Sequence, residues 1–352
     1  MNETLLIVGD PLENLSFRSD SSLAMAQGAL SLGYRVFWAT IENIGLLNGT
    51  PVISELHEIE EAKPDTPPRH RKIETNGNLK PISQFTRVLI RKDPPFDLSY
   101  IDLCWILSQC EAGRVINNPA ALLSFHEKLT PCQLVRDKVI PEYMTVPTIV
   151  SKKTEELKKF VNEQFRTAEL FLSQFQSIDA FKNFRFQILC KPWRGHGGRG
   201  IITFPSPAEF QNWLSLQSKT DDSLSEMIIV QPLLPEIHSR GDRRVFVVNG
   251  QVQFDFVRYP SAGRIEANLA QGGKASLEEM SEELSATAQK IALYLKQHGI
   301  LLAGLDFIGD RLTEVNVTSP TGIRTFEELT SKKCTTEIMK HLLEHDRTGE
   351  EY

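Results

Sequence analysis

The sequence contains few cysteines, and none of them has the spacing of a metal site. Its 352 residues include five cysteines, scattered between Cys104 and Cys334, and no pair forms C-x-x-C. Structural zinc sites need Cys and His ligands at short, regular spacings, so the sequence argues against zinc. Buried free thiols in a reduced, cytoplasmic protein are the simplest interpretation of this pattern.

Long apolar runs and a surplus of positive charge are absent as well. No apolar run approaches the roughly 18 residues that cross a bilayer, and the first residues carry no basic leader, so we expect neither a membrane partner nor a signal peptide. The chain carries 45 acidic and 39 basic side chains, a net charge of -6. Nucleic-acid-binding proteins usually carry a basic excess, so nucleic acid is not an expected partner. A local basic pocket for a small anion is compatible with this balance.

The sequence does contain the material for two or three folded domains, at about 150 residues each. Over the first 120 residues, short apolar strands alternate with helical patterns: strands at 5–8, 36–39, 88–90 and 115–116, and helices at 21–32, with Asp20 or Ser21 as its N-cap, and 99–110. This alternation predicts an α/β layer with a largely parallel sheet. Residues 57–84 interrupt the pattern with a polar, Pro-containing stretch, which we expect to be a surface loop or flexible insertion.

The remainder of the chain changes from helical to strand-rich. A charged helix is expected at 154–164, followed by strands at 227–230, 244–248, 252–257, 301–308 and 312–317, with helices at 276–298 and 335–344. Apolar residues make up 41% of the chain, which is enough for folded cores throughout.

A glycine-rich loop follows Lys191. Gly195, Gly197 and Gly200 form G-x-G-x-x-G, which is a weak signal by itself. Strand patterns lie on both sides, at 186–190 and 201–204, so the loop is predicted to be a hairpin lid over phosphates, with Lys191 placed to meet phosphate oxygens. A mobile surface turn is the alternative. The chain has no Walker A pattern and no H-R-D, which disfavours a P-loop NTPase and a protein kinase.

A second motif, at residues 304–317, is acidic. A three-residue turn at 309–311 would pair Asp306 with Glu314 and Gly304 with Asn316, which places three oxygen-bearing side chains on one face of the hairpin. Three such ligands are what a magnesium ion bridging nucleotide phosphates requires. The alternative is a solvated hairpin with ordinary surface polar groups.

Arginines accumulate between these two motifs. They are Arg240, Arg243, Arg244, Arg258 and Arg264. In an acidic chain this concentration indicates an anion pocket, whereas ordinary surface arginines paired with residues such as Asp242 and Glu266 are the alternative. Lys128, at an expected helix start, would mean little alone.

In this order, these segments resemble the ATP-grasp superfamily and, within it, the bacterial glutathione synthetases. The resemblance runs from residue 4 to about 330. Its most specific stretches are Arg91–Asp97, Gly241–Val245, Asn268–Gly273 and Gly304–Thr321.

The resemblance implies an α/β (α+β) ATP-grasp fold in three parts. These are an N-terminal pre-ATP-grasp α/β domain on the peptide-substrate side at 1–120, a central lid domain with the Gly-rich loop at 121–230, and a C-terminal catalytic domain at 231–352. The implied reaction joins γ-glutamylcysteine to glycine with ATP and Mg²⁺ (Mn²⁺ as a substitute) through an acyl phosphate, and gives glutathione, ADP and phosphate. Family members are often homo-oligomers, so a homo-oligomer is also an expectation.

The resemblance also implies roles for individual residues. For catalysis at the transferring phosphate it implies Arg244, Arg258, Arg264 and Asn268. For ATP it implies Lys128, Lys191, Gly195, Gly197, Gly198, Gln231, Leu233, Leu234 and Asp242. For magnesium it implies Asp306, Glu314 and Asn316, and for the peptide substrate Ser22, Arg91, Ser319 and Arg324.

One position departs from the family pattern. Two residues before Asn268 the family usually has Arg, whereas this chain has Glu266. Either Arg264 reaches the same phosphate, or the enzyme is another ATP-grasp carboxylate–amine ligase with a different peptide or amino-acid substrate. A non-catalytic ATP-binding protein and a kinase without ligase activity are further alternatives, and the intact Asp306, Glu314 and Asn316 set argues against the former.

Overall fold

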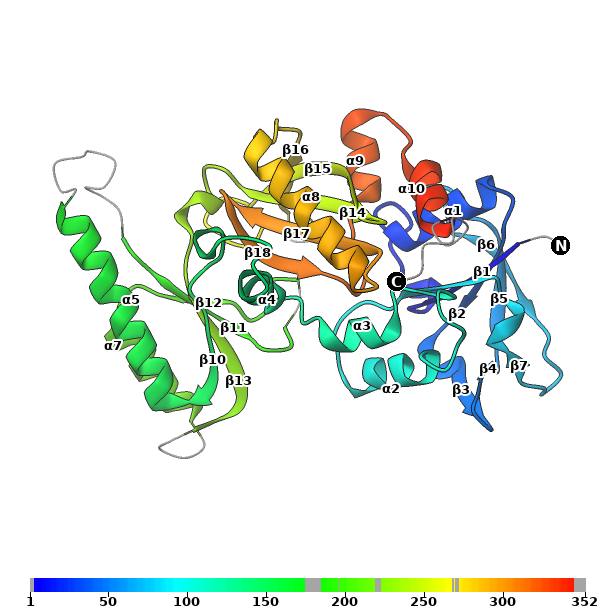
Figure 1. The fold of residues 1–352 in the computed structure, drawn as a ribbon, viewed down its shortest axis with the longest axis horizontal. Coiled ribbons are helices and arrows are strands. Elements are labelled where there is room, and N and C mark those ends of the chain that lie inside the picture. Colours follow the sequence, from blue (N-terminus) through cyan, green and yellow to red (C-terminus); the bar gives the residue numbers. More distant parts are fainter. Residues whose placement is uncertain are drawn as a thin grey trace. The chain divides into compact units, whose positions relative to one another are not determined.

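A computed structural model describes residues 3–174, 185–195, 197–218, 223–267, 269 and 272–344. The chain divides into two compact units (Figure 1). The first unit comprises residues 1–145 and 240–352, and the second comprises residues 146–239. Among the described residues, no helix combines the length and apolar character needed to cross a membrane.

The N-terminal part of the first unit is a six-stranded sheet with the order β6-β5-β2-β1-β8-β9. Its strands are β1 (Thr4–Gly9), β2 (Arg35–Ala39), β5 (Leu56–Glu61), β6 (Arg69–Ile73), β8 (Arg87–Arg91) and β9 (Val115–Ile116). β1 pairs in parallel with β2 and β8, and β8 pairs in parallel with β9. The expected parallel sheet is therefore confirmed for these four strands.

The expectation of a loop at 57–84 is wrong. This stretch forms most of β5 and all of β6, which pair antiparallel and extend the sheet beyond β2. It also supplies β7 (Lys80–Pro81), which joins β3 (Ile44–Leu47) and β4 (Thr50–Ile53) in a small sheet. The charged side chains are compatible with these strands because they pair across them: Glu58 on β5 binds Arg35 on β2 and Arg71 on β6.

Four helices accompany these strands: α1 (Ser21–Ser31), α2 (Leu98–Leu107), α3 (Pro119–Ser124) and α4 (Thr130–Arg136). The carboxylate of Asp20 accepts a 2.7 Å hydrogen bond from Leu23 N, so the expected N-cap of α1 is confirmed. The strand order reverses at β1, with β2 on one side and β8 on the other. In open α/β sheets ligands bind at the carboxyl ends of strands that flank such a reversal, which here are Gly9 and Arg91.

The C-terminal part of the first unit is an antiparallel sheet with the order β16-β15-β14-β17-β18. Its strands are β14 (Asp242–Val248), β15 (Gln251–Tyr259), β16 (Lys274–Ser276), β17 (Leu302–Ile308) and β18 (Arg311–Asn316), and its helices are α8 (Glu282–Gln297), α9 (Ile323–Thr330) and α10 (Thr335–Leu343). Val245 and Val247 pack in one core with α8, whereas Phe246 and Val248 pack in another with α9 and α10. Because side chains alternate along a strand, Arg244 lies on the side of Phe246.

The hairpin between β17 and β18 differs from its prediction in one respect. Ile308 pairs with Arg311 across a two-residue turn, in which Gly309 has φ 60°. Thr313 is then an extra residue, a β-bulge, and its hydroxyl donates to Asp306 O at 3.0 Å. The bulge restores the register, so Asp306 still pairs with Glu314. The prediction of a three-residue turn was wrong. The prediction that Asp306, Glu314 and Asn316 share one face of the hairpin is confirmed.

The second unit is an antiparallel sheet with the order β10-β13-β11-β12. Its strands are β10 (Ile149–Lys153), β11 (Ile188–Pro192), β12 (Ile202–Phe204) and β13 (Ser223–Pro232), and its helices are α5 (Thr154–Gln174) and α7 (Pro207–Gln217). Leu157, Phe210 and Leu214 of the helices form a core with Ile188 and Val230 of the sheet. β11 and β12 pair around the glycine loop, so the expected strand–loop–strand hairpin is confirmed.

Asn117 joins the six-stranded and the five-stranded sheets of the first unit. Its Oδ1 accepts the N–H groups of Leu301 and Leu302 at 2.8 Å each. Its Nδ2 donates to Leu302 O at 2.8 Å and to Val317 O at 2.9 Å. The side chain is buried, and it follows β9 directly while its partners lie at the start of β17 and just after β18.

We expect Asn117→Ala to lower the free energy of unfolding by about 3 kcal/mol or more, because it leaves several buried backbone groups without partners. The matched control is Asn118→Ala, which removes only the N-cap of α3 and should cost about 1 kcal/mol. Urea unfolding followed by tryptophan fluorescence measures both. Equal losses in the two variants would contradict the role of Asn117.

Candidate functional site

Five polar side chains meet on one face of the C-terminal sheet. We call them the charge cluster: Asp242, Arg244, Arg258, Asp306 and Asn316. The strand register creates it, since Arg244 on β14 pairs directly with Asp306 on β17, and Asp242 on β14 pairs directly with Arg258 on β15.

Asp306 is the centre of the charge cluster. Arg244 binds it in a bidentate manner, with Nε 2.5 Å from Oδ1 and Nη2 2.8 Å from Oδ2. Arg258 Nη2 lies 3.1 Å from the same Oδ1 and 2.5 Å from Oδ2 of Asp242. Asn316 Nδ2 donates to Asp306 Oδ2 at 2.9 Å. The carboxylate of Asp306 therefore has four donors, which matches its four lone-pair sites.

One glycine leaves space for Arg244, and a second leaves space for Phe256, which pairs with Arg244 across the strands. A Cβ on Gly304 would lie 3.1 Å from Arg244 Cδ and 3.2 Å from its Nε. A Cβ on Gly322, which has φ 131°, would lie 2.9 Å from a ring carbon of Phe256. The guanidinium of Arg244 also donates to Thr321 O at 3.0 Å. Its position is thus fixed by both neighbouring strands and by the segment after β18.

The pKa values of the two carboxyls shift in opposite directions. Burial acts to raise the pKa of Asp306, but Arg244 and Arg258 outweigh burial and hold it below its ordinary value. Burial raises the pKa of Asp242, Arg258 acts against this, and the charge of Asp306 adds to it. Burial acts to lower the pKa of Arg258, but the two carboxylates raise it above its ordinary value.

The predicted substrate residues Ser22, Arg91 and Ser319 come together in the first unit. Arg91 is 2% exposed; its Nε donates to Ser22 Oγ at 2.9 Å and its Nη2 to Pro320 O at 3.1 Å. Ser319 Oγ donates to Arg91 O at 3.4 Å. Within the described residues, Nη1 of Arg91 has no hydrogen-bond partner. Burial lowers the pKa of this guanidinium, and nearby acidic residues counter that only in part.

Two predicted residues lie apart from these groups. Arg324 is buried on α9, where it donates to Ala62 O at 3.3 Å and pairs with Glu327 at 3.5 Å. Arg264 is exposed and makes none of the described contacts of the charge cluster. Glu266 is half-buried, and Asn268 lies outside the described residues.

Lys128 lies in the turn before α4, beside β18. The carbonyl oxygen of Glu127 accepts Val315 N at 2.9 Å, which attaches this turn to the edge of β18. The Glu127 carboxylate accepts Thr318 Oγ1 at 2.7 Å and Thr318 N at 3.4 Å. Burial raises the pKa of Glu127, and Glu314 adds to this. Sequence reasoning missed Glu127, because neither its type nor its spacing signals a function.

The other predicted ATP residues belong to the second unit. Lys191 is buried on β11, and Gly195, Gly197 and Gly198 follow it. Gly197 has φ 61° and Gly198 has φ 75°, which non-glycine residues adopt at a cost. Gln231 Nε2 donates to Thr148 Oγ1 at 2.8 Å. Leu233 N donates to Gln187 O at 2.9 Å, and Leu234 follows it.

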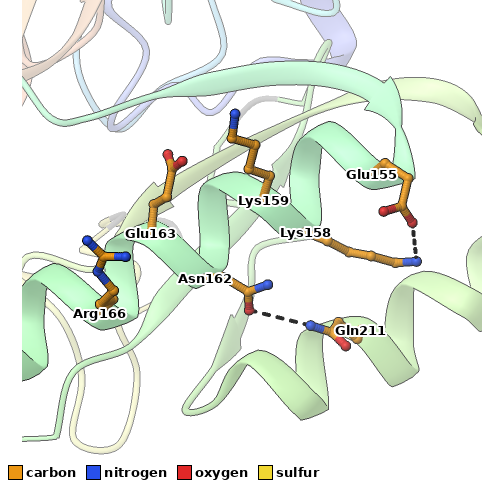
Figure 2. Close-up of a pocket in the computed structure, with 7 residues that line it drawn as sticks. All are labelled: Glu155, Lys158, Lys159, Asn162, Glu163, Arg166 and Gln211. Carbon is orange, nitrogen blue, oxygen red and sulfur yellow. Dashed lines mark hydrogen bonds and ion pairs between the residues drawn. The ribbon is translucent and has the colours of Figure 1, made fainter.

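A hollow of about 380 Å³ lies between α5 and α7 of the second unit (Figure 2). Two pairs of its lining side chains already bind one another: Lys158 with Glu155 at 2.7 Å, and Gln211 with Asn162 at 3.5 Å. None of its lining residues is a predicted site residue. It is an open surface groove with mixed charge rather than the candidate site.

Two family models match the chain. The N-terminal domain of prokaryotic glutathione synthetase matches residues 4–122, and the ATP-grasp domain of prokaryotic glutathione synthetase matches residues 164–331. The chain belongs to the prokaryotic glutathione synthetase family. A glutathione synthetase of Ralstonia nicotianae is 32% identical over 337 residues, covering 93% of this chain and 90% of that protein. One of Pseudomonas aeruginosa is 31% identical over 335 residues, covering 93% of each.

Solved structures support the fold. A D-cycloserine synthetase superposes with a TM-score of 0.59 at 13% identity, covering 97% of this chain and 99% of that chain. An ATP-grasp ligase complexed with a minimal precursor superposes with a TM-score of 0.56 at 16% identity, covering 98% and 100%. The expected ATP-grasp fold is therefore confirmed.

We expect Asp242 to take up a proton before Asp306 as the pH of the ligand-free protein falls. Arg258 is shared by both carboxyls, whereas Arg244 binds Asp306 alone, so Asp306 keeps its charge to lower pH. Carboxyl ¹³C shifts, assigned with Asp242→Asn and Asp306→Asn, give the order. The reverse order would show that the two arginines do not determine the titration.

Proposed function

We propose that this chain is a glutathione synthetase, which joins γ-glutamylcysteine to glycine with ATP and gives glutathione, ADP and phosphate. The observation that carries the proposal is the extent of the match with proteins of that name. It covers 93% of this chain and 90% of the Ralstonia relative, so it includes both the peptide-substrate side and the ATP side. A cytoplasmic location and a homo-oligomeric state stay predictions from the sequence.

In this proposal, the predicted ATP residues bind the nucleotide. Lys128 and Lys191 contact phosphate oxygens, and Gly195, Gly197 and Gly198 cover the phosphates with backbone N–H groups. Gln231, Leu233 and Leu234, at the end of β13 and just after it, form the linker that meets the adenine, and Asp242 meets the ribose. The three-domain division with boundaries at 120 and 230 is part of the same proposal.

The donor set of the hairpin fits magnesium. Asp306, Glu314 and Asn316 offer only oxygen ligands, the type that Mg²⁺ prefers. Asn316 donates to Asp306 through its Nδ2, so its Oδ1 is the ligand atom. Asp306 already accepts four hydrogen bonds, so a cation on this carboxylate takes the place of one donor. When bound, the ion would neutralise phosphate charge, and Mn²⁺ supplies the same chemistry.

Arg91 gives the strongest support for the proposed binding site of the peptide substrate. Its charge is buried, yet its described partners are a hydroxyl and a carbonyl, and Nη1 is unpaired. A buried cation without an anionic partner is costly, so a carboxylate of the peptide substrate is the complement that this site requires. Ser22 and Ser319 lie beside it to accept or donate further hydrogen bonds, and Arg324 is proposed to contact the same substrate.

The chain's own residues then account for the chemistry. The cysteine carboxylate of the peptide attacks the γ-phosphate of ATP, forming an acyl phosphate and releasing ADP. The amine of glycine displaces phosphate from that intermediate. Arg244 and Arg258 balance the negative charge that develops on the transferred phosphoryl group, and Arg264 and Asn268 are proposed to assist from the following loop. The intermediate must be kept from water, which would hydrolyse it.

A second candidate is another ATP-grasp carboxylate–amine ligase. The observation that favours it is Glu266, at the position where the family usually has Arg. An acidic side chain there would suit a substrate with more positive charge.

The deciding experiment measures ADP release and mass-identified product with γ-glutamylcysteine and glycine, against a panel of other dipeptides and amines. We expect glutathione as the preferred product. Turnover with other pairs, but none with γ-glutamylcysteine and glycine, would overturn the proposal and favour the second candidate.

Glu314→Gln should test the metal assignment more cleanly than a change at Asp306, which would also leave buried Arg244 without its carboxylate. We expect the Mg²⁺ concentration for half-maximal turnover to rise at least about tenfold, because a charged ligand becomes neutral. The melting temperature without ligands should change little. An unaltered Mg²⁺ dependence would remove Glu314 from the ligand set.

A further inference from the structure

The five residues after Val317 connect the elements that carry the candidate site residues. We call them the junction segment, Thr318–Gly322. Four parts of the first unit hold it. Thr318 bonds to Glu127 before α4, Ser319 and Pro320 bond to Arg91 at the end of β8, Thr321 bonds to Arg244 on β14, and Gly322 N donates to Ser21 Oγ on α1 at 3.1 Å.

Two of these anchors, Ser21 and Glu127, have not yet been given a role, and Glu127 makes more of the contacts. It makes two different attachments. Its main-chain oxygen accepts Val315 N at 2.9 Å, and its carboxylate accepts both the hydroxyl and the N–H of Thr318. One residue therefore fixes the edge of β18 and the start of the junction segment, and it immediately precedes Lys128.

We propose that Glu127 is a positioning residue that holds the junction segment in its substrate-binding conformation through Thr318. The inference rests on the proposed function, in which Ser319 and Arg91 meet the peptide substrate. Glu127 touches neither ATP nor peptide itself. It acts through Thr318, and the chain between Thr318 and Ser319 is a single peptide bond.

The geometry separates this effect from an effect on ATP. The turn containing Lys128 is held by bonds that do not involve the Glu127 carboxylate: His126 O accepts Leu129 N, Thr130 N and Thr130 Oγ1, at 2.9 Å each. Loss of the carboxylate therefore releases the junction segment but leaves the turn in place. KM for the peptide substrate should therefore rise. The charge of Glu127 also acts on Lys128, so the comparison with ATP uses the Thr318 variants, which keep that charge.

The kinetic experiment compares two disruptive variants with their conservative partners. Thr318→Val and Glu127→Ala should raise KM for γ-glutamylcysteine about tenfold, the cost of one hydrogen bond to a charged group. Thr318→Ser and Glu127→Gln keep a donor and an acceptor, so they should stay within about threefold of the wild type. KM for ATP should stay within the same limit in Thr318→Val and Thr318→Ser, which keep the charge of Glu127 that acts on Lys128. Thr167→Val is the matched control, since it removes a hydroxyl that donates to Glu163 O on α5 of the second unit, and it should change neither KM.

A second measurement does not depend on which substrates the enzyme uses. Amide hydrogen exchange over 317–322, read by mass spectrometry on the ligand-free proteins, should accelerate in Thr318→Val and Glu127→Ala and stay near the wild type in Thr318→Ser and Thr167→Val. Unchanged exchange in the disruptive variants, or a rise in KM for ATP equal to that for the peptide in Thr318→Val, would overturn the role of Glu127. Failure of the wild type to make glutathione, with the exchange pattern as expected, would instead overturn the proposed function alone.

Discussion

The buried pair between Arg244 and Asp306 is the interaction on which the rest of the site depends. It joins two neighbouring strands at directly opposed positions, and both ionised groups are almost fully removed from solvent. Removing one partner would leave the other as a buried charge without a counter-ion. The free-energy cost of that change is far larger than the stabilisation that the intact pair provides. The pair therefore constrains its surroundings: Gly304 must lack a side chain, Asn316 must donate to the carboxylate, and Arg258 must divide its hydrogen bonds between Asp306 and Asp242.

A second constraint is that the site is assembled from segments far apart in the sequence. Asn117 fixes the end of the N-terminal sheet to β17, and the junction segment fixes β8 and α1 to β14. Both connections use backbone groups at the ends of strands, where the ladder no longer satisfies them. The same hydrogen bonds thus complete the strands and bring Arg91 next to the segment that leads to the charge cluster.

Much of this arrangement could be predicted because it follows from local patterns. Period-two alternation placed Asp306, Glu314 and Asn316 on one face, and the Asp20 cap followed from its position before an apolar helix. The turn of the hairpin could not be predicted, because the bulge at Thr313 is stabilised by a bond to Asp306 O across the strands. The strands β5 and β6 were missed because their charged side chains are satisfied only by pairing across the strands. No local sequence pattern marked Glu127 as functional, because its hydrogen-bond partner Thr318 lies 191 residues away in the chain.

The net charge of the chain says little about its ligands, and the two buried arginines explain why. Arg244 is neutralised within the protein by Asp306, so it adds nothing to the overall balance and still presents donors at the site. Among the described residues, the hydrogen-bond partners of Arg91 are a hydroxyl and a carbonyl, one of its N–H groups has no partner, and nearby acidic residues compensate its charge only in part, so a ligand carboxylate is the complement that we propose for it. A protein with a net negative charge can therefore bind anions at a site where burial makes an unpaired cation costly.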